Sequence, residues 1–177
     1  GVTIDIGDAQ SGYAVIIQDN TVDGCGDDGI YGYAYISAPD NTTMGRFGIF
    51  SNTVAACANG IRLGTMHPGA EIANNQVTDS TSTGLLLATA GADVVDVAGN
   101  TVASSSLTDT VGIQVNRGQV NLAATTVTNH ATSIYNNGGL ITATATLTAS
   151  NDLVQQSGAF MAQTSALAVG GNLVLTG

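Results

Sequence analysis

The stretch FGIFSNTV, residues 47–54, contains the pattern that decides the fold. Apolar residues alternate with other residues, and an asparagine lies two positions before the closing valine. The template apolar-x-apolar-x-x-Asn-x-apolar recurs seven times, with a weaker copy in sixth place. Its copies end at Val22, Val54, Val77, Val102, Val127, Leu147 and Val174, at intervals of 20 to 32 residues. A recurrence of this kind indicates a chain built from repeated structural units.

The composition restricts both the fold and the partners. The 177 residues include 3 arginines, no lysine and 13 acidic residues, giving a net charge of -10. This charge would repel a partner bound through phosphate neutralisation, so we expect neither nucleic acid nor an anionic membrane. Charged residues are 9% of the chain, against about 25% usually, and the scarcity of Glu, Lys and Arg argues against a helical bundle.

Each template copy is followed by a second strand signal. These signals are Gly29-Ile30, Gly60-Ile61, Gly84-Leu85, Gly112-Ile113 and Ser133-Ile134. An isolated repeat of this size could not bury its apolar face, whereas stacked repeats can, with strands pairing in parallel about 4.8 Å apart. The sequence therefore predicts an all-β fold over residues 1–177, a single solenoid domain of about seven coils.

The recurring asparagine has a predicted structural role. It is present at Asn20, Asn52, Asn75, Asn100 and Asn172. Asparagine tolerates left-handed backbone at a bend, and stacked amides can hydrogen-bond along the solenoid axis. With these Asn-x-Val turns and Gly-Ile strands, the chain resembles the right-handed parallel β-helices of the pectin-lyase-like superfamily. The resemblance implies a right-handed parallel β-helix along nearly the whole chain, although fold does not specify function.

Strand alternation places one residue of each coil in an outward column. The predicted column is Tyr31, Arg62, Leu86, Gln114 and Tyr135, with Tyr33 and Tyr35 beside Tyr31. Sugar rings stack on exposed aromatic rings, and phenol, amide and guanidinium groups bond their hydroxyls. Alternatively, the segment 32–46 folds over the strand and buries the tyrosines as a satellite cluster. Arg62 suits sugar hydroxyls, a uronic acid carboxylate or a surface salt bridge.

The carboxylates offer two kinds of chemistry, catalysis and metal binding. Asp27 and Asp28, with Arg62, His67 and Glu71 nearby, could hydrolyse a glycosidic bond. Asp-Asp-Gly is also an ordinary turn, and we expect no catalytic residues. The aspartates Asp19, Asp23, Asp27 and Asp28 could hold calcium, but no EF-hand or nonapeptide motif is present. We therefore expect no cofactor and no metal, with calcium as the alternative.

Two cysteines occupy equivalent places in successive repeats. Cys25 and Cys57 each follow a closing valine by three residues. Stacking brings their Cα atoms to about 5 Å, which allows a disulfide. Two stacked buried thiols are the alternative.

These observations favour a non-catalytic carbohydrate-binding module that recognises a plant-type polysaccharide such as xylan. The chain resembles the β-helix xylan-binding modules of gut bacterial xylanases, which implies a covalently linked catalytic domain. A surface of Asp, Thr, Ser and Asn suggests a secreted protein and suits neutral sugars better than polyanionic ones. The alternatives are a polysaccharide lyase, glycoside hydrolase or phage tailspike depolymerase fragment, and a structural or adhesive stalk. For the stalk, Thr142, Thr144, Thr146 and Thr148 give a local hint.

Overall fold

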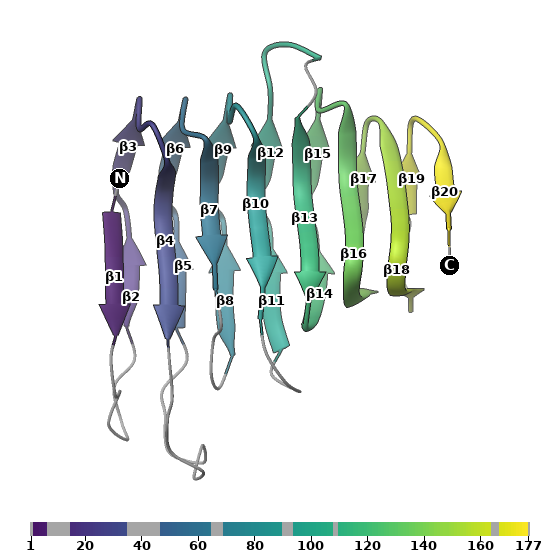
Figure 1. Ribbon diagram of the computed structural model, residues 1–177, viewed down its shortest axis with the longest axis horizontal. Helices are drawn as coiled ribbons and strands as arrows, with labels where there is room; N and C mark the ends of the chain where they lie inside the picture. Colours follow the sequence, from purple (N-terminus) through teal and green to yellow (C-terminus); the bar gives the residue numbers. More distant parts are fainter. Residues whose placement is uncertain are drawn as a thin grey trace, which may run out of the picture.

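The computed structural model describes residues 2–6, 15–34, 47–64, 69–89, 94–107, 110–163 and 167–176. All regular structure in these residues is β-strand, and the strands stack into a parallel solenoid from β1 to β20 (Figure 1). The predicted all-β solenoid is confirmed. The smaller sheet has seven strands, whereas the solenoid makes about five turns, fewer than the seven coils expected.

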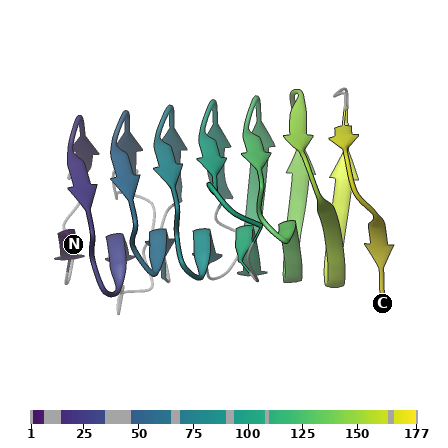
Figure 2. The same ribbon diagram turned by 90° about the horizontal axis from the view of Figure 1, so that it is seen from above.

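The solenoid has three faces, which Figures 1 and 2 show from two directions. Face one consists of β1 (Val2–Ile6), β4 (Asp28–Ala34), β7 (Asn59–Leu63), β10 (Thr83–Ala88), β13 (Val111–Arg117), the first halves of β16 (Thr132–Ala143) and β18 (Asp152–Ala162), and β20 (Leu173–Leu175). Face two consists of β2 (Ile16–Gln18), β5 (Phe47–Phe50), β8 (Ala70–Ala73), β11 (Val94–Ala98), β14 (Gln119–Ala123) and the second halves of β16 and β18. Face three consists of β3 (Thr21–Asp23), β6 (Thr53–Ala55), β9 (Gln76–Thr78), β12 (Thr101–Ala103), β15 (Thr126–Thr128), β17 (Leu147–Ala149) and β19 (Leu167–Val169).

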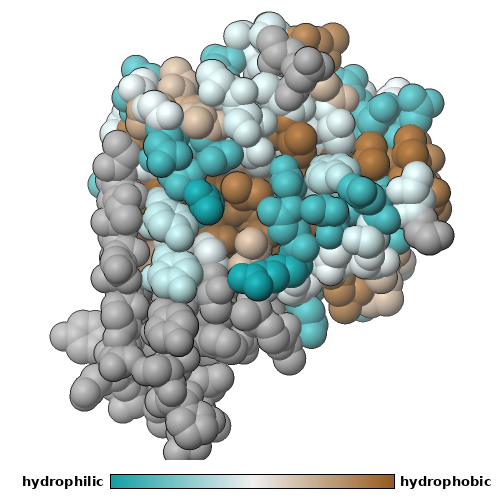
Figure 3. Space-filling view, in the orientation of Figure 1, coloured by the Kyte–Doolittle hydropathy of each residue, from teal (hydrophilic) through white to brown (hydrophobic). Residues whose placement is uncertain are grey.

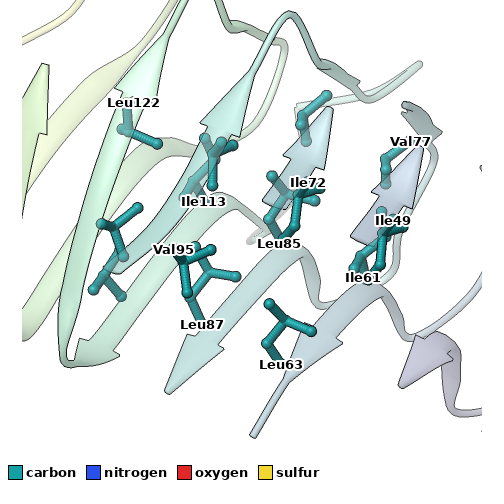
Figure 4. Packing of buried hydrophobic residues seen from close by; sticks show 14 of the residues in the cluster. Ile49, Ile61, Leu63, Ile72, Val77, Leu85, Leu87, Val95, Ile113 and Leu122 are labelled. Atoms are coloured by element: carbon teal, nitrogen blue, oxygen red, sulfur yellow. The ribbon is translucent and has the colours of Figure 1, made fainter. Parts of the chain in front are cut away.

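The core consists of inward columns of aliphatic side chains, one from each strand. On face one the column is fully buried and in register, and comprises Ile30, Ile61, Leu85, Ile113, Ile134 and Leu153. Figure 4 shows side chains of faces one and two pointing toward each other, as Ile61 does toward Ile49. Burying each such side chain contributes about 1.5–3 kcal/mol. The columns thus fix the alternation that places the next residue outside.

A glycine precedes the inward residue in four coils because a valine of the next coil occupies the space above it. A methyl group on Gly84 would overlap Val102, and the same relation joins Gly29 to Val54, Gly60 to Val77 and Gly112 to Val127. In the following coil Ser133 replaces the glycine, and Ala149 occupies the place of the valine. Where the glycine is replaced by the larger serine, the valine that packs on it is replaced by the smaller alanine.

Asparagines form a hydrogen-bonded ladder at the corner between faces two and three. The Nδ2 groups of Asn20, Asn52 and Asn75 each donate to the Oδ1 of the next asparagine at 3.0 Å, ending at Asn100. The residue preceding the asparagine has the left-handed backbone, with φ of 57° at Asp19 and 58° at Asn74. The prediction of stacked amides is confirmed for these four residues, but the left-handed bend lies one position earlier than expected.

The template loses its predicted phase toward the C-terminus. Strand register places Ala149 opposite Val127 and Val169 opposite Ala149, so Leu147 and Val174 are not closing residues. Leu147 instead takes the asparagine position. Asn172 is outside the ladder, because its Nδ2 donates to Asp152 Oδ1 at 3.2 Å.

Cys25 and Cys57 form a disulfide between the first two coils, with their Cα atoms 4.6 Å apart. Of the two alternatives left open by the sequence, the structure has the disulfide. The bond joins equivalent turns that follow β3 and β6, and therefore ties neighbouring coils together in the same register as their strands.

Candidate functional site

The predicted outward column exists as a continuous register across face one. Tyr31 lies opposite Arg62, Arg62 opposite Leu86, Leu86 opposite Gln114, and Gln114 opposite Tyr135. All five are half-buried beside fully buried neighbours. We call these five residues the outer column. Figure 3 shows its face, where hydrophilic residues surround hydrophobic ones near the centre.

Arg62 is held over the Tyr31 ring by an acidic neighbour. Its Cζ lies 5.0 Å from the ring centroid, and its Nη1 donates to Asp28 Oδ2 at 3.4 Å. Asn59 Nδ2 donates to the other oxygen, Asp28 Oδ1, at 2.8 Å. The Arg62 side chain is 43% exposed and that of Asp28 only 9%. The guanidinium is therefore partly open to solvent, and its charge is paired with the more deeply buried Asp28.

The second tyrosine of β4 extends the aromatic surface. The ring centroids of Tyr31 and Tyr33 are 6.3 Å apart with planes inclined by 37°. Tyr33 packs over Gly64, where a methyl group would crowd the ring. Both tyrosines stay half-buried, so part of each ring is accessible. Tyr35, also predicted for this site, lies outside the described residues.

Amide groups surround the other end of the outer column. Gln114 Nε2 donates to Asn116 Oδ1 at 2.8 Å, and the Tyr135 hydroxyl donates to Gln156 Oε1. Asn116 and Gln156 were missed by the sequence reasoning, whereas the Arg62–Asp28 pair is the salt bridge considered as an alternative for Arg62. Asn116 follows Gln114 by two residues on the same strand, so alternation alone could have found it. Gln156 lies at a register shift between β16 and β18. Its position could therefore not be predicted from the alternation of residues along the strand.

The carboxylate constellation considered for catalysis is not brought together. Glu71 lies on β8 of face two, whereas Asp28 lies on β4 of face one and is bonded to Arg62 and Asn59. His67 lies outside the described residues. Within the described ranges, no group of three or more His, Cys, Asp or Glu side chains could hold a metal ion.

The other histidine is a core residue. His130 is fully buried, its Nδ1 lies 3.0 Å from Thr110 Oγ1, and its Nε2 has no hydrogen-bond partner among the described residues. Burial lowers its pKa below the ordinary value, and the charge of Asp79 partly opposes this. Asp79 itself lines a cavity of about 260 Å³ with five serine and threonine residues of two neighbouring turns. The Ser105 backbone N–H, 2.6 Å from Asp79 Oδ1, lowers the pKa of that carboxyl.

Comparisons with known proteins give no family. The scan against family models found no match, and the searches of curated proteins and of solved structures found none either. In the part of the chain that the structure describes, no helix is long and apolar enough to cross a bilayer.

Proposed function

We propose that the chain is a non-catalytic carbohydrate-binding module that holds a neutral plant-type polysaccharide, such as xylan, along the outer column. The observation that carries this proposal is the register of two tyrosines, an arginine and a glutamine on one face of successive coils. Aromatic rings suit the C–H faces of sugars, and guanidinium and amide groups suit their hydroxyls.

The dimensions of the column support binding along the solenoid axis. Tyr31 and Tyr135 are separated by four strand pairings. At about 4.8 Å per pairing the column spans roughly 19 Å, room for about four sugar rings. We expect affinity to rise with oligosaccharide length up to about four residues and then level off.

The wider setting is part of the proposal. A right-handed coil, membership of the pectin-lyase-like superfamily and attachment to a glycoside hydrolase are proposed from the resemblance of the sequence. The Cys25–Cys57 disulfide favours an oxidising compartment, and so supports a secreted protein. The net charge of -10 favours neutral glycans over anionic ones.

The test is affinity electrophoresis on gels containing xylan and other neutral polysaccharides. Tyr31→Ala and Tyr135→Ala should each weaken retention about threefold to tenfold, because each removes one stacking surface. Gln76→Ala, on exposed face three, is the matched control and should leave retention unchanged. Equal retention of all three variants would contradict the proposal. Release of reducing sugar, or of unsaturated product absorbing near 235 nm, would replace it with the enzyme alternative.

A second candidate, an adhesive or structural segment, is favoured by a row of threonines on face three. The outward residues in register there are Thr21, Thr53, Gln76, Thr101, Thr126 and Thr148. Of the threonines expected to mark such a segment, only Thr148 is in this row, and Thr142 on β16 is buried. Loss of surface adhesion in Thr53→Ala with Thr101→Ala, but not in Tyr31→Ala, would favour this second function.

A further inference from the structure

We propose that Asp28 determines the selectivity of face one, by neutralising Arg62 so that the site accepts neutral sugars and rejects carboxylated ones. This inference rests on the proposed function, since it concerns the ligand of the same surface. It assigns Asp28 a role in specificity rather than in the catalysis considered for it from the sequence.

The contacts of Asp28 make it part of the site. One carboxylate oxygen accepts from Arg62 at 3.4 Å and the other from Asn59 at 2.8 Å. Its side chain is 9% exposed, so it lies beneath the arginine rather than beside it in solvent. A bound ligand therefore contacts the guanidinium of Arg62 directly, whereas the carboxylate of Asp28 acts on the ligand only through its electrostatic field.

The two kinds of sugar respond differently to this pair. A hydroxyl needs only an N–H donor, and a guanidinium has five, of which the structure uses one for Asp28. A uronic acid carboxylate needs the net positive charge, and Asp28 lies well within a Debye length, about 8–10 Å, of any group bound to Arg62. The attraction of Arg62 for a carboxylate is therefore largely cancelled by repulsion from Asp28.

Asp28→Asn is a conservative way to remove this repulsion. The amide oxygen can still accept from Asn59, and the Tyr31 ring still attracts the guanidinium from 5.0 Å. Arg62 then carries an unpaired charge on a surface that already stacks sugar rings. We expect the variant to gain affinity for carboxylated sugars without losing affinity for neutral ones.

The experiment measures binding of a xylo-oligosaccharide and an oligogalacturonate of equal length at low salt. Asp28→Asn should bind the oligogalacturonate about threefold to tenfold more tightly than the parent chain, and the xylo-oligosaccharide within twofold. Asp23→Asn is the control, since it removes the same charge from exposed face three of the same coil. Adding Arg62→Gln to Asp28→Asn should abolish the gain, and melting curves report whether each variant is folded.

Three outcomes separate the two proposals. A gain specific to Asp28→Asn and dependent on Arg62 supports the inference. Neutral binding by the parent chain, with equal effects of Asp28→Asn and Asp23→Asn, overturns the inference and leaves the carbohydrate-binding function intact. Binding of neither oligosaccharide by the parent chain or by Asp28→Asn overturns both.

Discussion

The N-terminal and C-terminal coils place their buried amide at different corners. In the N-terminal coils the corner between faces two and three holds Asn75, whose Nδ2 donates to Ile49 O at 2.9 Å and to Asn100 Oδ1 at 3.0 Å. Two coils beyond Asn100, the fully buried Leu147 occupies this place. An amide that satisfies backbone carbonyls has been replaced by a core side chain.

The corner between faces one and two shows the opposite change. Asn136 is fully buried there, and its Nδ2 donates to Gly139 O at 3.0 Å and to Ala159 O at 3.1 Å. The residues in register with it in earlier coils are aliphatic and buried, namely Leu63, Leu87 and Val115. In β16 the strand passes from one face to the other with no break, and the amide satisfies the backbone of that tight corner. The buried amide therefore lies at a different corner in the two regions, and in β16 it lies where the backbone turns tightly.

The two regions also differ in how well they are covered. The N-terminal coils carry the disulfide and the complete asparagine ladder. At the C-terminal end, Leu173 is 55% exposed, Leu175 63% and Met161 45%, whereas in the described N-terminal coils Ile16, at 55%, is the exposed large hydrophobic residue. Local unfolding free energy depends on buried apolar contacts. We therefore expect amide exchange to be slowest near β9 and β12 and fastest at β19 and β20.

The largest expected effect comes from removing the disulfide. Its loss would make the N-terminal coils less stable and so reduce their difference from the C-terminal end. Replacing Cys25 and Cys57 by Ala frees a pair separated by 32 residues. In the chain-entropy account this costs about 3–4 kcal/mol of unfolding free energy. Urea denaturation of the parent chain, with and without reductant, and of the double variant measures it. Equal stability of all three samples would show that the bond contributes nothing.

Gly84→Ala tests the paired sizes of glycine and valine. The added methyl overlaps Val102 and the carbonyl of Gly112, so we expect a loss of about 2–3 kcal/mol, measured by urea denaturation. Ser133→Ala is the matched change in the C-terminal region. It removes only the acceptor of the Asn151 N–H, 2.9 Å away, and should cost about 1 kcal/mol. A smaller cost for Gly84→Ala than for Ser133→Ala would contradict the size argument.

The asparagine ladder should matter more in its interior than at its end. Asn75→Ala removes the side-chain donor to the Ile49 carbonyl and the acceptor of the buried Asn52 N–H, and should cost about 2 kcal/mol. Asn20→Ala, on the exposed end of the ladder, should cost about 0.5 kcal/mol. Thermal melts of both variants provide the comparison. Similar melting temperatures for the two would mean that burial does not set the value of these bonds.

The smallest effect concerns pH and His130. Burial lowers its pKa, so below pH 6.5 the unfolded chain binds a proton that the folded chain resists. Stability should be complete above that value and fall as the pH decreases below it. The lowered pKa of Asp79 adds a separate loss only below about 3.8. Urea midpoints between pH 7.5 and 5 should fall less steeply in His130→Gln, and an unchanged slope would assign the effect to other groups.

The sequence predicted the parts of the fold that depend on periodicity. Ile30 and Ile61 mark the phase of face one, and from it the alignment of Tyr31 with Arg62 follows by alternation. The C-terminal phase was wrong because Leu147 satisfies the apolar template although it occupies the asparagine position. A salt bridge of Arg62 was one alternative given by the sequence, but the choice of Asp28 as its partner depends on side-chain reach. The contact of Gln156 depends on a register shift, which periodicity does not predict.

The matched sizes of glycine and valine have a consequence for engineering. The closing valines Val77, Val102 and Val127 follow one another at equal intervals of 25 residues. Each coil therefore ends with the shape that the next one requires. A duplicate of residues 78–102 inserted after Val102 would meet a matching neighbour on both sides. The solenoid could therefore be lengthened by one coil without changing its other residues.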